Sequence, residues 1–201
     1  MSFLQQLQNK RSALRATTTT VTTATGKRFI ESNGSSSLPV LLEERSYGFV
    51  VDTKPDAIPA CILPDFLYLG SQDAANPENI TTFKLTHILS IGIGTPAIVK
   101  GLVATKFIPC LDLPETRLLD VIQEANAFIN EVHLCCGRVF VHCNAGVSRA
   151  ASIIIGYLIL EHNMIFEDAF ALVKSERECI QPNVGFIKQL KSINKPKAEI
   201  T

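Results

Sequence analysis

The stretch that decides the fold reads His142-Cys143-Asn144-Ala145-Gly146-Val147-Ser148-Arg149. It follows a strand-like run, residues 137–141, and leads into an apolar run of helix length, residues 150–160. A strand, a short loop and a helix N-terminus form an anion site, because unpaired backbone N–H groups converge there with the positive end of the helix dipole. The sequence therefore predicts an anion-binding loop at the carboxyl end of a central strand.

The residue types in this loop indicate phosphoryl transfer. Gly146 lets the chain adopt the backbone angles that turn amide groups toward an anion. Cys143 at the mouth of such a site is expected to be a thiolate, the nucleophilic form, and Arg149 adds a planar guanidinium that can bind two phosphate oxygens. A nucleophile that faces a phosphate site predicts a cysteinyl-phosphate, whereas the alternative is that Cys143 is a small buried core residue.

The flanking sequence predicts an alternating α/β domain. Strands are expected at residues 66–69, 86–91, 104–111 and 137–142, and helices at residues 118–134, 149–161, 166–177 and 184–193, with a further helix that begins at Asn76-Pro77. Such alternation favours a central, mainly parallel sheet flanked by helices. Residues 1–57 are predicted to be a partly disordered N-terminal arm, in which residues 5–15 could form a helix, and residues 196–201 to be a C-terminal tail.

The loop at residues 142–149 resembles the signature loop of the cysteine-based protein phosphatases, in particular the dual-specificity branch. Residues 67–75, 86–91 and 181–190 resemble the first strand and turn, the next strand and the closing helix of that branch. The resemblance covers residues 58–195, which are therefore predicted to be the catalytic domain with the dual-specificity fold. Ala150, with residues 111–116, is most similar to the atypical subgroup that regulates stress-activated protein kinase pathways.

The resemblance implies an enzyme that hydrolyses phosphotyrosine and phosphoserine or phosphothreonine on signalling proteins. Its expected partners are phosphorylated proteins, with mitogen-activated protein kinases or their regulators as targets. The uncharged side chains within the loop argue against a ligand that carries several phosphates. The phosphate would be bound by the residues that follow the nucleophile, Asn144, Ala145, Gly146, Val147, Ser148 and Arg149.

Supporting roles also come from the resemblance. Asp112 matches the general acid, His142 is expected to hydrogen-bond the loop backbone, and Asn183 is expected to brace the loop. Purely structural roles stay open for two of these residues, because Asp112 and Asn183 could each cap a turn or a helix. Glu115 and Asp120 are alternative candidates for the general acid. Arg177 and Lys174 could contact substrate or interact with a helix dipole. Cys110 or Cys179 could form a disulfide with Cys143.

One position departs from the family pattern. The residue after the arginine is usually Ser or Thr, whose hydroxyl stabilises the departing thiolate, but here it is Ala150. We therefore expect formation of the phosphoenzyme to be intact and its breakdown to be slow. The alternative function is a phosphoprotein-binding scaffold with weak turnover.

Composition limits the other classes of function. The 201 residues contain 19 basic and 19 acidic side chains, so net charge favours neither nucleic acid nor an anionic membrane as a partner. The cysteines have no zinc-binding spacing, and neither a metal nor a cofactor is expected. A thiolate enzyme needs a reducing compartment, and the N-terminus has no apolar signal core, so a cytoplasmic location is predicted.

Overall fold

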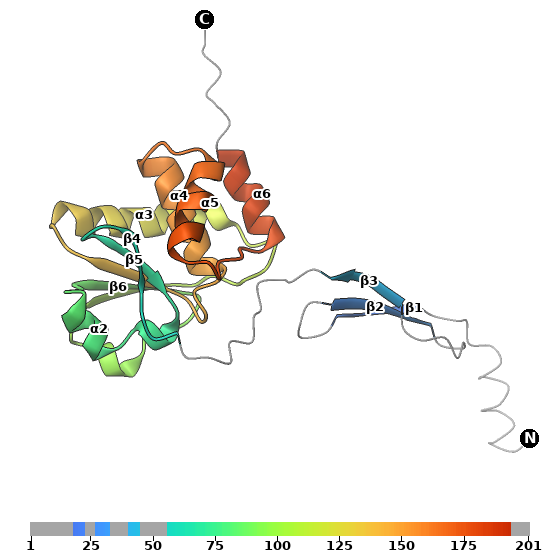
Figure 1. Cartoon of the computed structure of the whole chain (residues 1–201), viewed down its shortest axis with the longest axis horizontal. Coiled ribbons are helices and arrows are strands. Elements are labelled where there is room, and N and C mark those ends of the chain that lie inside the picture. Colours follow the sequence, from blue (N-terminus) through green and yellow to red (C-terminus); the bar gives the residue numbers. More distant parts are fainter. Residues whose placement is uncertain (1–17, 23–26, 33–39, 45–55, 194–201) are drawn as a thin grey trace, which may run out of the picture. The chain divides into compact units, whose positions relative to one another are not determined.

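The computed structural model describes residues 18–22, 27–32, 40–44 and 56–193 (Figure 1). The chain divides into two compact units, Met1–Val51 and Asp52–Thr201. The expected helix at residues 5–15 and the expected tail at residues 196–201 lie outside the described residues.

The first unit contains a small antiparallel sheet in the order β1-β2-β3. Its strands are β1 (Thr18–Thr22), β2 (Lys27–Ser32) and β3 (Val40–Glu44). The sequence does not predict this sheet, because the polar, low-complexity composition of the arm indicates disorder. The physical reason for strands is that β-branched residues, four threonines and a valine in β1, favour the extended backbone.

The second unit is built on a five-stranded sheet in the order β4-β5-β8-β6-β7. Its strands are β4 (Ala60–Leu63), β5 (Leu67–Gly70), β6 (His87–Ile91), β7 (Ala104–Ile108) and β8 (Val139–His142). Four strands run parallel and β4 pairs antiparallel with β5, so the mainly parallel sheet is confirmed. The edge strand β4 is an element that the sequence analysis does not predict.

Helices cover both faces of this sheet (Figure 1). They are α2 (Pro77–Thr82), α3 (Leu118–Leu134), α4 (Arg149–Glu161), α5 (Phe166–Glu176) and α6 (Val184–Ile193). α4 packs against α3, α5, α6 and the sheet, which explains why its apolar run is buried on all sides. α2 lies on the opposite face (Figure 1). The helices predicted at residues 118–134, 149–161, 166–177 and 184–193 are confirmed within one residue.

Local chemistry sets several of these boundaries. Asn76 caps α2, since its Oδ1 accepts a hydrogen bond from Asn79 N at 2.9 Å, and Pro77 occupies the first helical position. β7 ends at Ile108, earlier than predicted, just before Pro109, which has no N–H to donate to a strand ladder. The consequence for the site is that residues 109–117 form a loop at the carboxyl edge of the sheet.

Candidate active site

The predicted anion-binding loop lies between the central strand β8 and helix α4. Cys143 directly follows β8 and Arg149 begins α4, and the side chain of Cys143 is buried, with 2% of the residue exposed. Gly146 has a φ of +65°, and a Cβ atom there would lie 2.4 Å from the carbonyl oxygen of Gly70. Both the left-handed backbone and the close approach of β5 therefore require glycine.

Arg149 has one buried donor that makes no hydrogen bond. Its Nη1 donates to the carbonyl oxygen of Gly92 at 3.0 Å, while its Nε is buried without a hydrogen-bond partner. The nearest acidic atom, Asp112 Oδ2, is 3.9 Å from this Nε. Buried polar atoms in folded proteins almost always have partners, so an unpaired guanidinium donor beside this loop fits a tetrahedral oxyanion as the missing partner.

Gly92 is a site residue that the sequence reasoning missed. It has a φ of +66°, and a Cβ atom there would lie 2.1 Å from the carbonyl oxygen of Cys110 and 2.5 Å from Arg149 Nη1. Its carbonyl anchors the arginine, so any side chain would displace the phosphate-binding group. The available signal was a glycine directly after strand β6.

Asp112 is brought to the loop, as the resemblance implies. Its Oδ1 accepts hydrogen bonds from Ser148 Oγ and from Asn183 Nδ2, each at 2.7 Å. Asp112 does not cap α3, because Leu118 N at the start of that helix donates instead to Gln189 Oε1 at 2.9 Å. With Oδ1 occupied, Oδ2 is the oxygen that is left to carry a proton toward a leaving group.

The alternative candidates for the general acid are placed elsewhere. Glu115 is exposed, and Asp120 forms an ion pair with Arg117 on the exposed side of α3, with 3.2 Å between Arg117 Nε and Asp120 Oδ2. Neither contacts the residues of the phosphate loop among the hydrogen bonds and ion pairs of the described residues. The geometry therefore favours Asp112.

Helix α6 holds the acid loop in place. Asn183 has two roles: its Oδ1 caps the helix by accepting from Phe186 N at 2.9 Å, and its Nδ2 binds Asp112. Gln189 Nε2 donates to the carbonyl oxygen of Thr116 at 2.8 Å. A Cβ on Gly185 would lie 2.1 Å from the carbonyl oxygen of Pro114, so the glycine allows the loop to pack directly on the helix.

His142 is fully buried and connects the loop to strand β6. Its Nδ1 lies 3.1 Å from the carbonyl oxygen of Cys143, and its Nε2 lies 2.8 Å from Ser90 Oγ, which is 2.7 Å from Thr95 Oγ1. A carbonyl can only accept, so Nδ1 carries the proton and Nε2 accepts from Ser90. The Cys143 carbonyl therefore fixes the histidine tautomer, and Ser90 completes the hydrogen bonding of the ring at Nε2, a role that the sequence did not predict.

The protonation of His142 gives a testable dependence of stability on pH. Burial lowers the pKa of His142 below the ordinary value of 6.5, although the hydrogen bond with the Cys143 carbonyl opposes the shift. As pH falls below 6.5, the unfolded chain takes up a proton that the folded protein still excludes, so the free energy of unfolding decreases.

We expect His142→Asn to flatten this decrease, since the amide can still donate to the carbonyl but does not titrate. Urea unfolding on both sides of pH 6.5 would measure the slope, and His133→Asn, at an exposed histidine of α3, is the control. His87, whose pKa burial also lowers, is retained in both variants. A slope in His142→Asn equal to that of the parent would contradict the assignment.

The loop after α5 braces the phosphate loop from behind. Arg177, which is 7% exposed, donates through Nε to the carbonyl oxygen of Gly146 at 3.0 Å and through Nη2 to that of Ala145 at 2.9 Å. Gln181 N donates to the carbonyl oxygen of Val147 at 2.8 Å. Arg177 thus faces the carbonyl side of the loop, which is inconsistent with the suggested contact to substrate.

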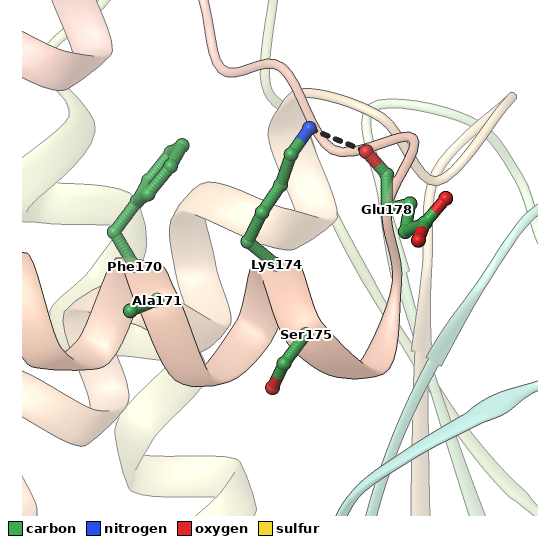
Figure 2. Close-up of a pocket in the computed structure, with 5 residues that line it drawn as sticks. All are labelled: Phe170, Ala171, Lys174, Ser175 and Glu178. Carbon is green, nitrogen blue, oxygen red and sulfur yellow. Dashed lines mark hydrogen bonds between the residues drawn. The ribbon is translucent and has the colours of Figure 1, made fainter.

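Lys174 also serves this loop. It lines a shallow pocket on α5, and its Nζ donates to the carbonyl oxygen of Glu178 (Figure 2). The same Nζ donates to the carbonyl oxygen of Ile180 at 2.9 Å. Its ammonium group therefore connects α5 to the segment that follows the helix. The alternative of a substrate contact has no support in this geometry.

Ser148 contacts the acid rather than the nucleophile. Its Oγ donates to Asp112 and accepts from Asn183 N at 3.2 Å, and Ala150 is buried in the first turn of α4. Within residues 56–193, no side-chain hydroxyl donates a hydrogen bond to Cys143 Sγ. Ser148 therefore does not take over the function of the hydroxyl that is missing at Ala150.

The remaining groups have limited roles. Burial raises the pKa of the Cys110 thiol to about 11, although the positive charge of Arg149 opposes the shift, so Cys110 is a poor nucleophile at neutral pH.

The described residues contain no group of three metal-ligating side chains. Within the part of the chain that the structure describes, no helix has both the length and the apolar character needed to cross a membrane.

Comparison with known proteins agrees with this geometry. Residues 67–195 match the family described as "Dual specificity phosphatase, catalytic domain". The mouse dual specificity protein phosphatase 19 is 42% identical over 187 residues, which cover 90% of this chain and 84% of that protein. The Drosophila melanogaster dual specificity protein phosphatase MPK-4 is 38% identical over 62% of this chain, which spans only 33% of that relative.

Solved structures agree as well. The human tyrosine phosphatase-like serine/threonine/tyrosine-interacting protein is 30% identical, with a TM-score of 0.61 over 67% of this chain and 93% of that chain. Both the fold and the sequence therefore point to one family. The chain belongs to the dual-specificity protein phosphatases, in their atypical branch.

Proposed function

We propose that this phosphatase acts through a cysteinyl-phosphate on Cys143. The observation that supports the proposal is the buried Nε of Arg149, which has no hydrogen-bond partner. It lies in the same loop as the buried Cys143 and 3.9 Å from Asp112 Oδ2. A phosphoryl group bound there would satisfy the guanidinium. It would also place phosphorus next to the nucleophile.

The reaction would proceed in two steps. In the first, the Cys143 Sγ–P bond forms, the P–O bond to the leaving group breaks, and Asp112 gives its proton to the leaving oxygen. In the second, a water oxygen attacks phosphorus, its proton passes to Asp112, and the S–P bond breaks to release phosphate and the thiolate. Atoms and protons balance without a further reactant.

The proposed substrates are phosphorylated signalling proteins, including components of mitogen-activated protein kinase pathways. The uncharged loop residues support a single phosphate as the recognised group. A cytoplasmic location is part of the proposal, because a reactive thiolate needs a reducing environment.

A second function, phosphoprotein binding with weak turnover, is favoured by one specific observation. Ala150 leaves the departing thiolate without the hydroxyl partner that the family usually supplies, and Ser148 is bound to Asp112. The loss of one hydrogen bond to a charged group corresponds to about 1.5–3 kcal/mol, or about ten- to a hundredfold in rate. Breakdown of the phosphoenzyme would then limit turnover.

We therefore expect Ala150→Ser to accelerate turnover about ten- to a hundredfold. Rapid-quench hydrolysis of a chromogenic aryl phosphate should show a burst followed by slow turnover in the parent, and a faster steady state in Ala150→Ser. Ser175→Ala, which removes an exposed hydroxyl that donates to the Leu172 carbonyl oxygen within α5, is the control.

The outcomes separate the two functions. A burst that Cys143→Ser abolishes supports the covalent mechanism. Neither burst nor turnover above the Cys143→Ser background would favour the binding function. Fast turnover without a burst would retain the enzyme and contradict the role assigned to Ala150.

A further inference from the structure

The guanidinium of Arg177 orients two peptide units of the phosphate loop. In a planar trans peptide, the C=O and the following N–H point in opposite directions. Because Arg177 binds the carbonyl oxygens of Ala145 and Gly146, the N–H groups of Gly146 and Val147 point away from Arg177. Inward-pointing N–H groups are what an anion-binding loop needs.

Arg177 is itself held by an acidic residue from a distant part of the sequence. Its Nη2 forms an ion pair with Asp56 Oδ2, and the side chain of Asp56 is only 29% exposed. The backbone around Asp56 is fixed as well: its carbonyl oxygen accepts from Ser71 Oγ at 2.8 Å, and the carbonyl oxygen of Ala57 accepts from Asn79 Nδ2 at 2.6 Å. Asp56 therefore has a defined position from which to orient the guanidinium.

We propose that Asp56 and Arg177 form a positioning pair that sets the geometry of the phosphate loop for its anion. The inference rests on the proposed function, since it concerns the same loop, and it adds a residue that lies outside the predicted catalytic domain at residues 58–195. Asp56 touches neither the nucleophile nor the acid in the hydrogen bonds and ion pairs of the described residues. It acts through Arg177 alone.

If Asp56 acted only through its negative charge, removing it would change the affinity for an anion in the opposite direction from a loss of positioning. Asp56 is a negative charge on the far side of Arg177, so its removal should strengthen the attraction of the loop for an anion if only the field mattered. If Asp56 orients Arg177, its removal should weaken anion binding, because the carbonyls lose their fixed partner. The direction of the change therefore distinguishes positioning from charge.

The test is equilibrium binding of inorganic tungstate, a tetrahedral oxyanion, to the full chain by titration calorimetry. Cys143→Ser is the background, so that binding is measured without turnover. Adding Asp56→Asn should raise the dissociation constant about tenfold, as is typical when a partner that orients a ligand-binding group is removed. Asp56→Glu, which restores the carboxylate, should recover part of the affinity.

The matched control is Asp65→Asn. Asp65 Oδ1 is also paired with an arginine, 2.7 Å from Arg138 Nη2. Asp65 precedes β5, however, so it lies at the amino end of the parallel strands, opposite the end that carries the phosphate loop. This change should leave tungstate binding unaltered. If Asp56→Asn fails to fold, Arg177→Lys, which keeps the charge but not the planar fork, tests the same geometry.

Each outcome is informative. Weaker binding in Asp56→Asn, with Asp65→Asn unchanged, supports the positioning pair. Unchanged or tighter binding overturns it, even if the parent binds tungstate and hydrolyses phosphate. No binding by the Cys143→Ser background would instead count against the proposed phosphate site itself.

Discussion

Asp112→Asn should lower kcat/KM, which reports formation of the phosphoenzyme, about 10²- to 10⁴-fold for a phosphate ester with a basic leaving group, the range typical for loss of a general acid. Asparagine can keep the hydrogen bonds from Ser148 and Asn183 through its carbonyl oxygen, so the loop geometry should survive. What is lost is the proton on the second oxygen. With a good leaving group such as dinitrophenolate, which needs no proton, the variant should have nearly the same kcat/KM as the parent.

The comparison of leaving groups makes this prediction specific. Steady-state kinetics on a phosphoserine peptide and on dinitrophenyl phosphate would measure both cases. Asp120→Asn, which removes an exposed carboxylate from α3, should change neither. An equal loss of kcat/KM on both substrates in Asp112→Asn would mean that Asp112 supports the loop structurally and is not the acid.

Arg149→Lys should reduce kcat/KM about 10²- to 10⁴-fold. Lysine keeps the positive charge, but it lacks the planar fork, the Nε donor that now has no partner, and the Nη1 contact to Gly92. Two hydrogen bonds to a charged group, at about 1.5–3 kcal/mol each, correspond to the predicted range. The loss should appear in phosphate inhibition as well as in turnover, because the guanidinium binds the ground state too.

Arg138→Lys is the control for this change. Arg138 pairs with Asp65 and binds the Phe83 carbonyl, at the edge of the sheet away from the loop. Kinetics of hydrolysis and the inhibition constant of inorganic phosphate should be unchanged in the control. A mild effect of Arg149→Lys, comparable with that of Arg138→Lys, would show that charge alone suffices at position 149.

Much of the second unit could be predicted because its signals are local. The loop at residues 142–149 lies between a strand and a helix, and the buried residues of α3 recur at helical spacing, so periodicity identified the elements. Asp112 and Asn183 were assigned by resemblance, and the structure brings both to Ser148. Their roles in the reaction stay predictions.

The contacts that the sequence did not reveal are long-range. Arg149 binds the carbonyl oxygen of Gly92, and Arg177 binds those of Ala145 and Gly146. Because the acceptors are backbone atoms, which every residue has, no sequence motif marks these contacts. Ser90 meets His142 only because β6 and β8 are adjacent in the sheet. Strand pairing of this kind is a property of the fold, which residue spacing does not encode.

The dependence of the acid loop on α6 has a consequence for biosynthesis. Proteins are made from the N-terminus, and the loop that carries Asp112 is fixed by three residues that follow it by about 70 positions, Asn183, Gly185 and Gln189. A nascent chain in which translation has reached only α5 would contain the nucleophile and the arginine but no partner for the acid. Phosphatase activity should therefore arise late, after α6 has left the ribosome, which would keep incomplete chains from acting on phosphoproteins.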